Sequence, residues 1–168
     1  MYHSKVLFIC CLLLTLALLL GGCGGAQVSP AEVMDAMCAT QKPLPAGKIL
    51  IRSLPQENDR HLSDTLLAVT FGNGSLPPAL DGVRDAACFF AYTQPCELAV
   101  FLCNSNNAAQ NVAKMCLRRL DLLKVQYAHD AANQDCFENA AVVVRGKWVV
   151  LCVAPDPSAA LRAFRRAV

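Results

Sequence analysis

The sequence predicts an α+β fold in which helices pack on one face of a four-stranded, mainly antiparallel sheet. Two pairs of short apolar runs, each pair joined by a turn, predict two β-hairpins. Apolar residues spaced three and four apart in the flanking segments predict amphipathic helices. The expected order is α-α-β-β-α-β-β-α, and a chain of 168 residues has room for one domain of ordinary size.

Two helices are expected before the sheet. Ser29-Pro30-Ala31-Glu32 is a capping box with proline at the first helical position, so the first helix begins there. The stretch from Thr40 to Pro55 is polar and contains prolines, which is typical of a connecting segment. A second helix is predicted from His61 to Phe71, and a short one is possible near Ala79 to Arg84.

The predicted hairpins enclose a long helix. The first hairpin joins the runs Cys88 to Tyr92 and Glu97 to Leu102, and the second joins Ala140 to Val144 and Trp148 to Val153. The long helix runs from the Asn104 to Asn107 region to about Tyr127, with one apolar stripe formed by Ala109, Val112, Cys116, Leu120, Leu123 and Tyr127. Asp156-Pro157 caps a last helix, in which Leu161, Phe164 and Val168 share a face and Arg162, Arg165 and Arg166 point elsewhere.

The ten cysteines do not form a recognisable framework. Cys10 and Cys11 lie in the apolar N-terminal segment, and the seven after Cys23 are an odd number without a C-x-x-C motif. Most of those seven occupy apolar positions of predicted elements, so we expect small core hydrophobes. One or more disulfides, or a catalytic or metal-binding thiol, are the alternatives. The seven are Cys38, Cys88, Cys96, Cys103, Cys116, Cys136 and Cys152.

The N-terminal segment is typical of a secretory signal peptide. Val6 to Leu20 contains one polar residue, Thr15, and follows Lys5. A helix of this length covers about 22 Å, less than the hydrocarbon thickness of about 30 Å. The length therefore favours the apolar region of a signal peptide, and the small residues after Leu20 favour a cleavage site.

Leu20-Gly21-Gly22-Cys23 resembles the lipobox of bacterial lipoproteins. The resemblance implies that residues 1–22 are removed and that the Cys23 thiol carries a diacylglyceryl group. Residues 23–28 then form a tether that reaches at most about 20 Å, and residues 29–168 form the domain. Two acyl chains give a stable membrane anchor. A secreted protein cut elsewhere, or an uncleaved anchor in which Cys23 is incidental, is the alternative.

The whole pattern resembles one family of small bacterial lipoproteins. The resemblance combines the lipobox, the short linker and the capped first helix with the run from Asn139 to Leu151, where a valine-rich strand, a glycine turn and an aromatic residue follow an Asn-Ala start. The chain is thereby similar to domain-of-unknown-function family 4358. The segment Asp135 to Glu138 departs from the usual tyrosine-bearing approach of that family. The family implies location and fold, and no catalytic residues.

Chemistry-bearing motifs are few. One predicted loop contains side chains that can bind a metal: His129, Asp130, Asp135 and Glu138. A solvated polar loop has the same composition. We therefore expect no metal, cofactor or catalytic site. Glu97 has no carboxylate partner nearby in sequence, so we expect a hairpin-edge charge rather than an acid catalyst.

The charge balance excludes an electrostatic nucleic-acid binder. The net charge of +2 falls to +1 without Lys5, since 14 basic side chains then face 13 acidic ones. The arginines Arg162, Arg165 and Arg166 either contact anionic headgroups or form a solvated face. We expect a non-enzymatic, membrane-tethered domain at the outer face of the cell membrane that binds a protein or envelope component. The alternative is an envelope enzyme, or an enzyme accessory, with a site in the sheet loops.

Overall fold

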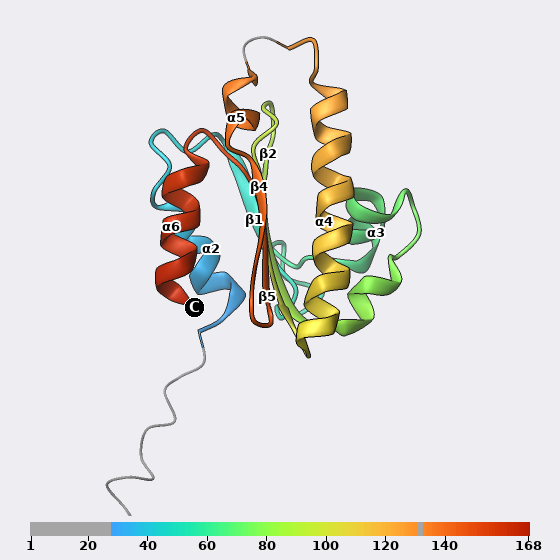
Figure 1. Ribbon diagram of the computed structural model, residues 1–168. Helices are drawn as coiled ribbons and strands as arrows, with labels where there is room; N and C mark the ends of the chain where they lie inside the picture. Colours follow the sequence, from blue (N-terminus) through green and yellow to red (C-terminus); the bar gives the residue numbers. More distant parts are fainter. Residues whose placement is uncertain (1–27, 131–132) are drawn as a thin grey trace, which may run out of the picture.

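The computed structural model describes residues 28–130 and 133–168. It is an α+β fold with one antiparallel sheet of five strands in the order β1-β2-β3-β5-β4 (Figure 1). The strands are β1 (Gly47–Ile51), β2 (Val83–Ala91), β3 (Glu97–Cys103), β4 (Ala141–Arg145) and β5 (Trp148–Val153). The helices are α2 (Pro30–Cys38), α3 (Asp64–Gly72), α4 (Asn106–Gln126), α5 (Asp135–Glu138) and α6 (Pro157–Ala167), with a 3-10 turn η1 (Pro78–Gly82).

The prediction of a four-stranded sheet is wrong, because β1 lies within the polar stretch from Thr40 to Pro55 that the sequence predicts to be a connecting segment. This edge strand has the sequence GKILI. Gly47 and Lys48 have low strand propensity, so only three apolar residues remain, too few to predict a strand. It pairs antiparallel with β2, with Ile51 opposite Ala87. The two predicted hairpins are confirmed, and β2 begins at Val83, earlier than expected.

Helices cover both faces of the sheet, so the prediction of helices on one face is also wrong. Figure 1 shows α2 and α6 on one side of the sheet and α3 and α4 on the other. The physical reason lies in β3, whose residues are all buried, as expected for a strand with apolar side chains on both faces. Alternate residues of a strand point to opposite faces, so each face of β3 needs its own cover.

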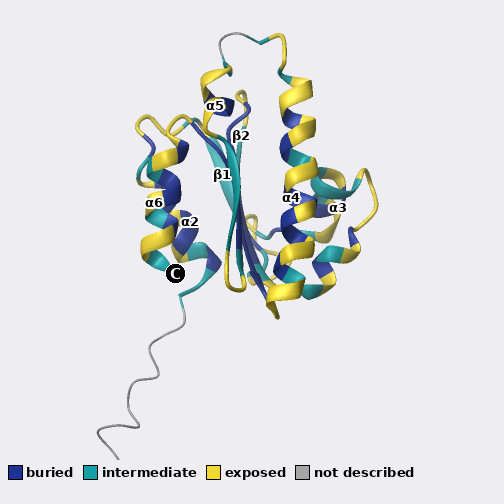
Figure 2. Ribbon diagram, viewed as in Figure 1, coloured by how far each residue is buried: buried dark blue, intermediate teal, exposed yellow. Residues whose placement is uncertain are grey.

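Two hydrophobic clusters result, one on each face, and Figure 2 shows the buried positions along the facing sides of sheet and helices. The α4 side of the sheet contributes Ala99 and Phe101 from β3, and α4 covers them with the predicted stripe. The other side contributes Leu98 and Val100, which α2 and α6 cover with Val33, Met34, Met37, Leu161 and Phe164. Each cluster therefore depends on β3 and on a different set of helices.

The helix starts follow local capping chemistry. The Ser29 hydroxyl accepts from the Glu32 backbone N–H at 3.3 Å, and the Glu32 carboxylate accepts from the Ser29 N–H at 2.7 Å, which confirms the predicted capping box. Asp156 caps α6, as predicted, by accepting from the Ala159 N–H at 2.8 Å. Ser105 caps α4 by accepting from the Ala108 N–H at 3.1 Å. These side chains fix where each helix leaves its loop.

Gln41 joins the end of α2 to the start of α6. Its side-chain oxygen accepts from the Asp156 N–H at 2.9 Å, and its amide nitrogen donates to the Asp156 carbonyl at 3.0 Å. Gln41 is 4% exposed, so these bonds satisfy a buried polar group and hold the two helices together. In the described part of the chain, no helix is both long enough and apolar enough to cross a membrane.

The close approach of β1 to β2 depends on Gly47. A Cβ at this position would lie 2.4 Å from the Phe90 carbonyl oxygen and 2.6 Å from the Phe89 ring. We expect Gly47→Ala to lower the free energy of unfolding by about 1–3 kcal/mol, because β1 must shift to relieve the overlap. Urea unfolding followed by circular dichroism measures this loss.

The neighbouring Lys48→Ala is the matched control. Lys48 pairs with Asp59, whose side chain is 81% exposed, so the loss should stay below about 1 kcal/mol. Equal stability losses in the two variants would show that the contact at Gly47 does not limit the position of β1.

Candidate functional site

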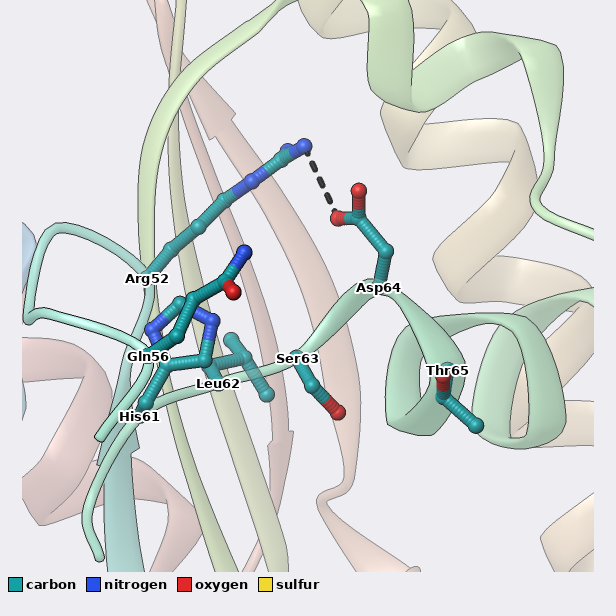
Figure 3. Close-up of a pocket in the computed structure, with 7 residues that line it drawn as sticks. All are labelled: Arg52, Gln56, His61, Leu62, Ser63, Asp64 and Thr65. Atoms are coloured by element: carbon teal, nitrogen blue, oxygen red, sulfur yellow. Dashed lines mark hydrogen bonds and ion pairs between the residues drawn. The ribbon is translucent and has the colours of Figure 1, made fainter. Parts of the chain in front are cut away.

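A polar hollow of about 510 Å³ lies where the chain leaves β1 and returns to α3. Arg52 directly follows β1, and the returning segment is fixed by two backbone bonds, from Ile51 N–H to the Arg60 carbonyl and from Leu62 N–H to the Ile51 carbonyl. This loop brings together side chains from three places in the sequence (Figure 3). The lining consists of Arg52, Gln56, His61, Leu62, Ser63, Asp64 and Thr65.

The charged groups of the hollow partner one another or the backbone. Arg52 Nη2 donates to Asp64 Oδ1 at 3.1 Å, as Figure 3 shows, and Arg52 Nη1 is buried without a hydrogen-bond partner. The Arg52 side chain is 25% exposed and that of Asp64 is 61% exposed, so solvent weakens their attraction. His61 Nδ1 lies 2.7 Å from the Leu54 carbonyl oxygen. In the neutral tautomer in which Nδ1–H donates to this carbonyl, Nε2 is a hydrogen-bond acceptor.

This arrangement favours binding over catalysis. Ser63 is the hydroxyl nearest to His61 in sequence, but it caps α3 by accepting from the Leu66 N–H at 3.2 Å. His61 is held by a backbone carbonyl, whereas an activated serine needs a histidine that is hydrogen-bonded to it and oriented by a further group. The hollow therefore offers a guanidinium, an imidazole and a carboxylate for polar contacts.

Glu97 and Arg119 form a second polar centre, at the beginning of β3. Arg119 Nη2 donates to Glu97 Oε2 at 2.7 Å, and Arg119 Nε donates to the two carboxylate oxygens at 3.1 and 3.2 Å. The Glu97 side chain is 5% exposed, so the expectation of a hairpin-edge charge is wrong. Burial raises the pKa of Glu97 above its ordinary value, and the Arg119 guanidinium opposes this shift without cancelling it.

Sequence reasoning missed this pair because its members lie 22 residues apart. Arg119 does carry a signal, since it follows Cys116 by three residues and precedes Leu123 by four, and so lies on the buried stripe of α4. A cation on such a stripe needs a buried partner. Arg119 also lines a small pocket of about 110 Å³ together with Glu97, Cys96, Leu123 and Tyr127.

Helix α4 carries a partly apolar outer face. Leu117 is 48% exposed, Leu122 is 50% exposed and Val125 is 75% exposed. Basic residues accompany them, since Lys114, Arg118 and Lys124 are exposed on the same helix and Asp121 is the acidic residue among them. We call this set the α4 outer face.

A groove of about 350 Å³ runs between α3 and the α4 outer face. Its α3 side carries Phe71, whose ring packs edge-on against Phe101 with the centroids 5.6 Å apart. Its α4 side includes Leu122, Val125 and Arg119. The groove is therefore open to solvent on one side and rests on the hydrophobic core on the other.

The loop residues proposed as alternative metal ligands do not come together. Asp135 and Glu138 lie on the short helix α5, which the sequence did not predict, and the Asp130 carboxylate accepts from Asn133 Nδ2 at 2.6 Å. Residues 28–130 and 133–168 contain no group of three or more His, Cys, Asp or Glu side chains placed to hold a metal ion. His129 is exposed.

The seven cysteines after Cys23 are buried free thiols, in agreement with the prediction that they act as small core hydrophobes. Burial raises the pKa of Cys38 to about 11 and those of Cys96 and Cys152 to about 12. Such thiols are poor nucleophiles because little thiolate forms at neutral pH. Cys23, the predicted lipidation site, lies outside the described residues.

Comparison with protein-family models, with curated proteins and with solved structures finds no match for this chain. The resemblance to family 4358 accordingly stays a prediction, and the functional argument depends on the geometry of the chain itself.

The Glu97–Arg119 pair gives a stability test. Arg119→Met leaves the buried Glu97 carboxylate unpartnered and should cost about 3–5 kcal/mol of unfolding free energy at pH 7. Adding Glu97→Leu removes the stranded charge, so the double variant should recover most of this loss. Urea unfolding of the two single variants and the double variant measures the coupling. Additive losses would contradict a direct interaction.

The raised pKa of Glu97 predicts the sign of a pH effect. The folded state holds the proton of Glu97 more tightly than the unfolded state, where the pKa is near 4.5. The stability linked to this proton is full below the unfolded pKa and is lost as the pH rises through the folded pKa. We compare the free energies of unfolding of Glu97→Gln and the natural chain. The amount by which the variant is less stable should shrink as the pH rises from about 4.5, the unfolded pKa, through the folded pKa of Glu97. A disadvantage that grows with pH would show that the pKa is lowered.

Proposed function

We propose that the chain is a lipoprotein, anchored through Cys23 at the outer face of the cytoplasmic membrane, whose domain binds a protein or envelope component without catalysis. The lipobox-like sequence Leu20-Gly21-Gly22-Cys23 supports the anchor. The α4 outer face carries the binding part of the proposal, because it leaves three large apolar side chains in solvent. Apolar surface grouped in this way, with polar residues around it, is typical of interaction sites.

The chemistry of the α4 outer face favours an amphipathic, acidic partner segment. Leu122 and Val125 supply apolar contacts at the groove between α3 and α4. Lys114, Arg118 and Lys124 outnumber Asp121 on the exposed side of the helix. A partner helix or strand with apolar and acidic side chains would match both features.

The position of α4 also supports this proposal. The described chain begins beside α2 and α6, whereas α4 covers the opposite face of the sheet (Figure 1). A tether leading from Cys23 to α2 leaves the α4 outer face on the far side of the sheet from the point of attachment.

The hollow around Arg52 supports a second candidate function: within the alternative of an envelope enzyme or enzyme accessory it favours the accessory role, because its polar groups are arranged for binding a ligand. Arg52, His61 and Asp64 converge in the hollow. The hollow lies in a loop that follows a strand, and the sequence predicts the site of this alternative function in such a loop. The two candidates differ in what they bind, because the hollow suits a small polar ligand and the α4 outer face suits a protein segment.

Cys23→Ala tests the anchor. The proposed thioether needs the Cys23 sulfur, so this change should abolish incorporation of labelled palmitate. It should also release the protein from the membrane fraction. Labelling and fractionation in a bacterial host with a lipoprotein pathway measure both effects. Cys11→Ala is the matched control, since it removes another leader cysteine and should leave labelling unchanged. Unchanged labelling of Cys23→Ala would refute the anchor.

A photo-crosslinking amino acid at Val125 tests the binding surface. Val125 is 75% exposed, so the label should be tolerated and should form a discrete crosslinked product with a protein partner in the native cell. Labels at Ser158, exposed on α6, and at Gln56, in the Arg52 hollow, are the controls. A product from Gln56 with none from Val125 would overturn this assignment, because it would place the protein partner at the Arg52 hollow and not at the α4 outer face.

A further inference from the structure

We infer that one side of α6 is a contact surface for anionic lipid headgroups, which orients the domain on the membrane; this inference rests on the proposed anchor. The surface consists of Arg162, Arg165 and Arg166 of α6 together with Arg145 at the end of β4, and we call it the α6 basic surface. All of these residues are exposed.

The arginines of α6 form one continuous basic face. Arg162, Arg165 and Arg166 are spaced three and four residues apart, which brings them to the same side of the helix. The opposite side, with Leu161 and Phe164, is buried against α2 and the sheet. Helix α6 contains no acidic residue, so the charge of this face is not neutralised along the helix itself.

The β4–β5 turn extends this surface. Arg145 is the last residue of β4, directly before the turn to β5, and its Nη1 donates a hydrogen bond to the Arg165 carbonyl oxygen, so its side chain reaches the C-terminal end of α6. Lys147 is exposed in the same turn. The neighbouring helix α2 carries two acidic residues, Glu32 and Asp35, against five basic side chains, the three arginines of α6 together with Arg145 and Lys147. The surface as a whole is therefore basic.

The tether ends at this surface. Val28, the first described residue, packs against the same hydrophobic cluster as Ala167 and Val168 at the other end of the chain. Figure 1 accordingly shows the C-terminus beside the start of α2. The five residues from Gly24 to Val28 that follow Cys23 reach at most about 20 Å, so a lipid anchor on Cys23 holds the end of α6 near the headgroups.

Electrostatic attraction at this distance has a measurable size. Each arginine near an anionic surface raises the partition coefficient about fivefold, so the three arginines of α6 together contribute about a hundredfold at low salt. Because exposed charges are screened, 1 M salt with its screening length of about 3 Å should remove most of this preference.

The test uses the chain from Cys23 to Val168 without lipid, so that the result does not depend on the anchor. This chain contains every residue of both hydrophobic clusters. The probe is a vesicle of phosphatidylcholine with or without 30% phosphatidylglycerol, labelled with a dansyl lipid. Trp148, the single tryptophan, packs on the α2 and α6 side of the sheet and serves as the energy-transfer donor. Vesicle co-sedimentation gives the partition coefficient.

The expected result is stronger partitioning and stronger energy transfer with the anionic vesicles. The triple variant Arg162→Gln, Arg165→Gln, Arg166→Gln should lose this preference about a hundredfold. The matched control Lys114→Gln, Arg118→Gln, Lys124→Gln removes the same charge from α4, across the sheet, and should retain most of it.

Equal partitioning to neutral and anionic vesicles would overturn the inference, and so would an equal loss in the control. Either result leaves the Cys23→Ala labelling experiment unaffected, so failure of this inference and failure of the anchor are distinguishable. Circular dichroism of each variant checks that the fold is retained.

Discussion

Burial of β3 on both faces is the constraint on which the fold depends. The strand pairs with β2 on one side and β5 on the other, and every one of its residues is buried. Its side chains alternate between the two clusters, with Phe101 in one and Val100 in the other. Because neither face can be left in water, α4 must cover one and α2 with α6 the other. The molecule therefore has two helical surfaces that are separated by the sheet.

Glu97 is the exception within this strand, and its position links the core to the candidate groove. A carboxylate that is 5% exposed needs a partner, and Arg119 supplies three donated hydrogen bonds from the buried stripe of α4. Arg119 also lines the groove between α3 and α4. The ion pair therefore fixes the position of α4 relative to β3 close to where Leu122 and Val125 reach solvent. A buried pair is a weak source of stability but restricts how two elements dock, and here it restricts the surface proposed for binding.

Local signals in the sequence were sufficient for the elements and insufficient for their arrangement. Capping residues such as Ser29 and Asp156 and the α4 stripe located helices correctly, because these effects act within a few residues. Strand β1 was missed since Gly47 and Lys48 resemble a loop, and without β1 the hollow around Arg52 could not be foreseen. The partner of Glu97 lies one strand and most of a helix away, beyond any local pattern. The continuous apolar run of β3, with apolar side chains on both faces of the strand, does predict that both faces of the sheet are covered by helices.

The two helical surfaces differ in the partners that their chemistry admits. The α6 basic surface is charged and lacks large exposed apolar side chains, so it suits a hydrated anionic layer. The α4 outer face mixes Leu117, Leu122 and Val125 with basic residues, so it suits a partner that removes apolar area from water. Because the sheet lies between the two surfaces, a short tether at α2 would bring the first surface to the membrane and turn the second away from it. In that orientation, the proposed lipid attachment and the proposed protein contact would use opposite sides of β3 and would not compete for space.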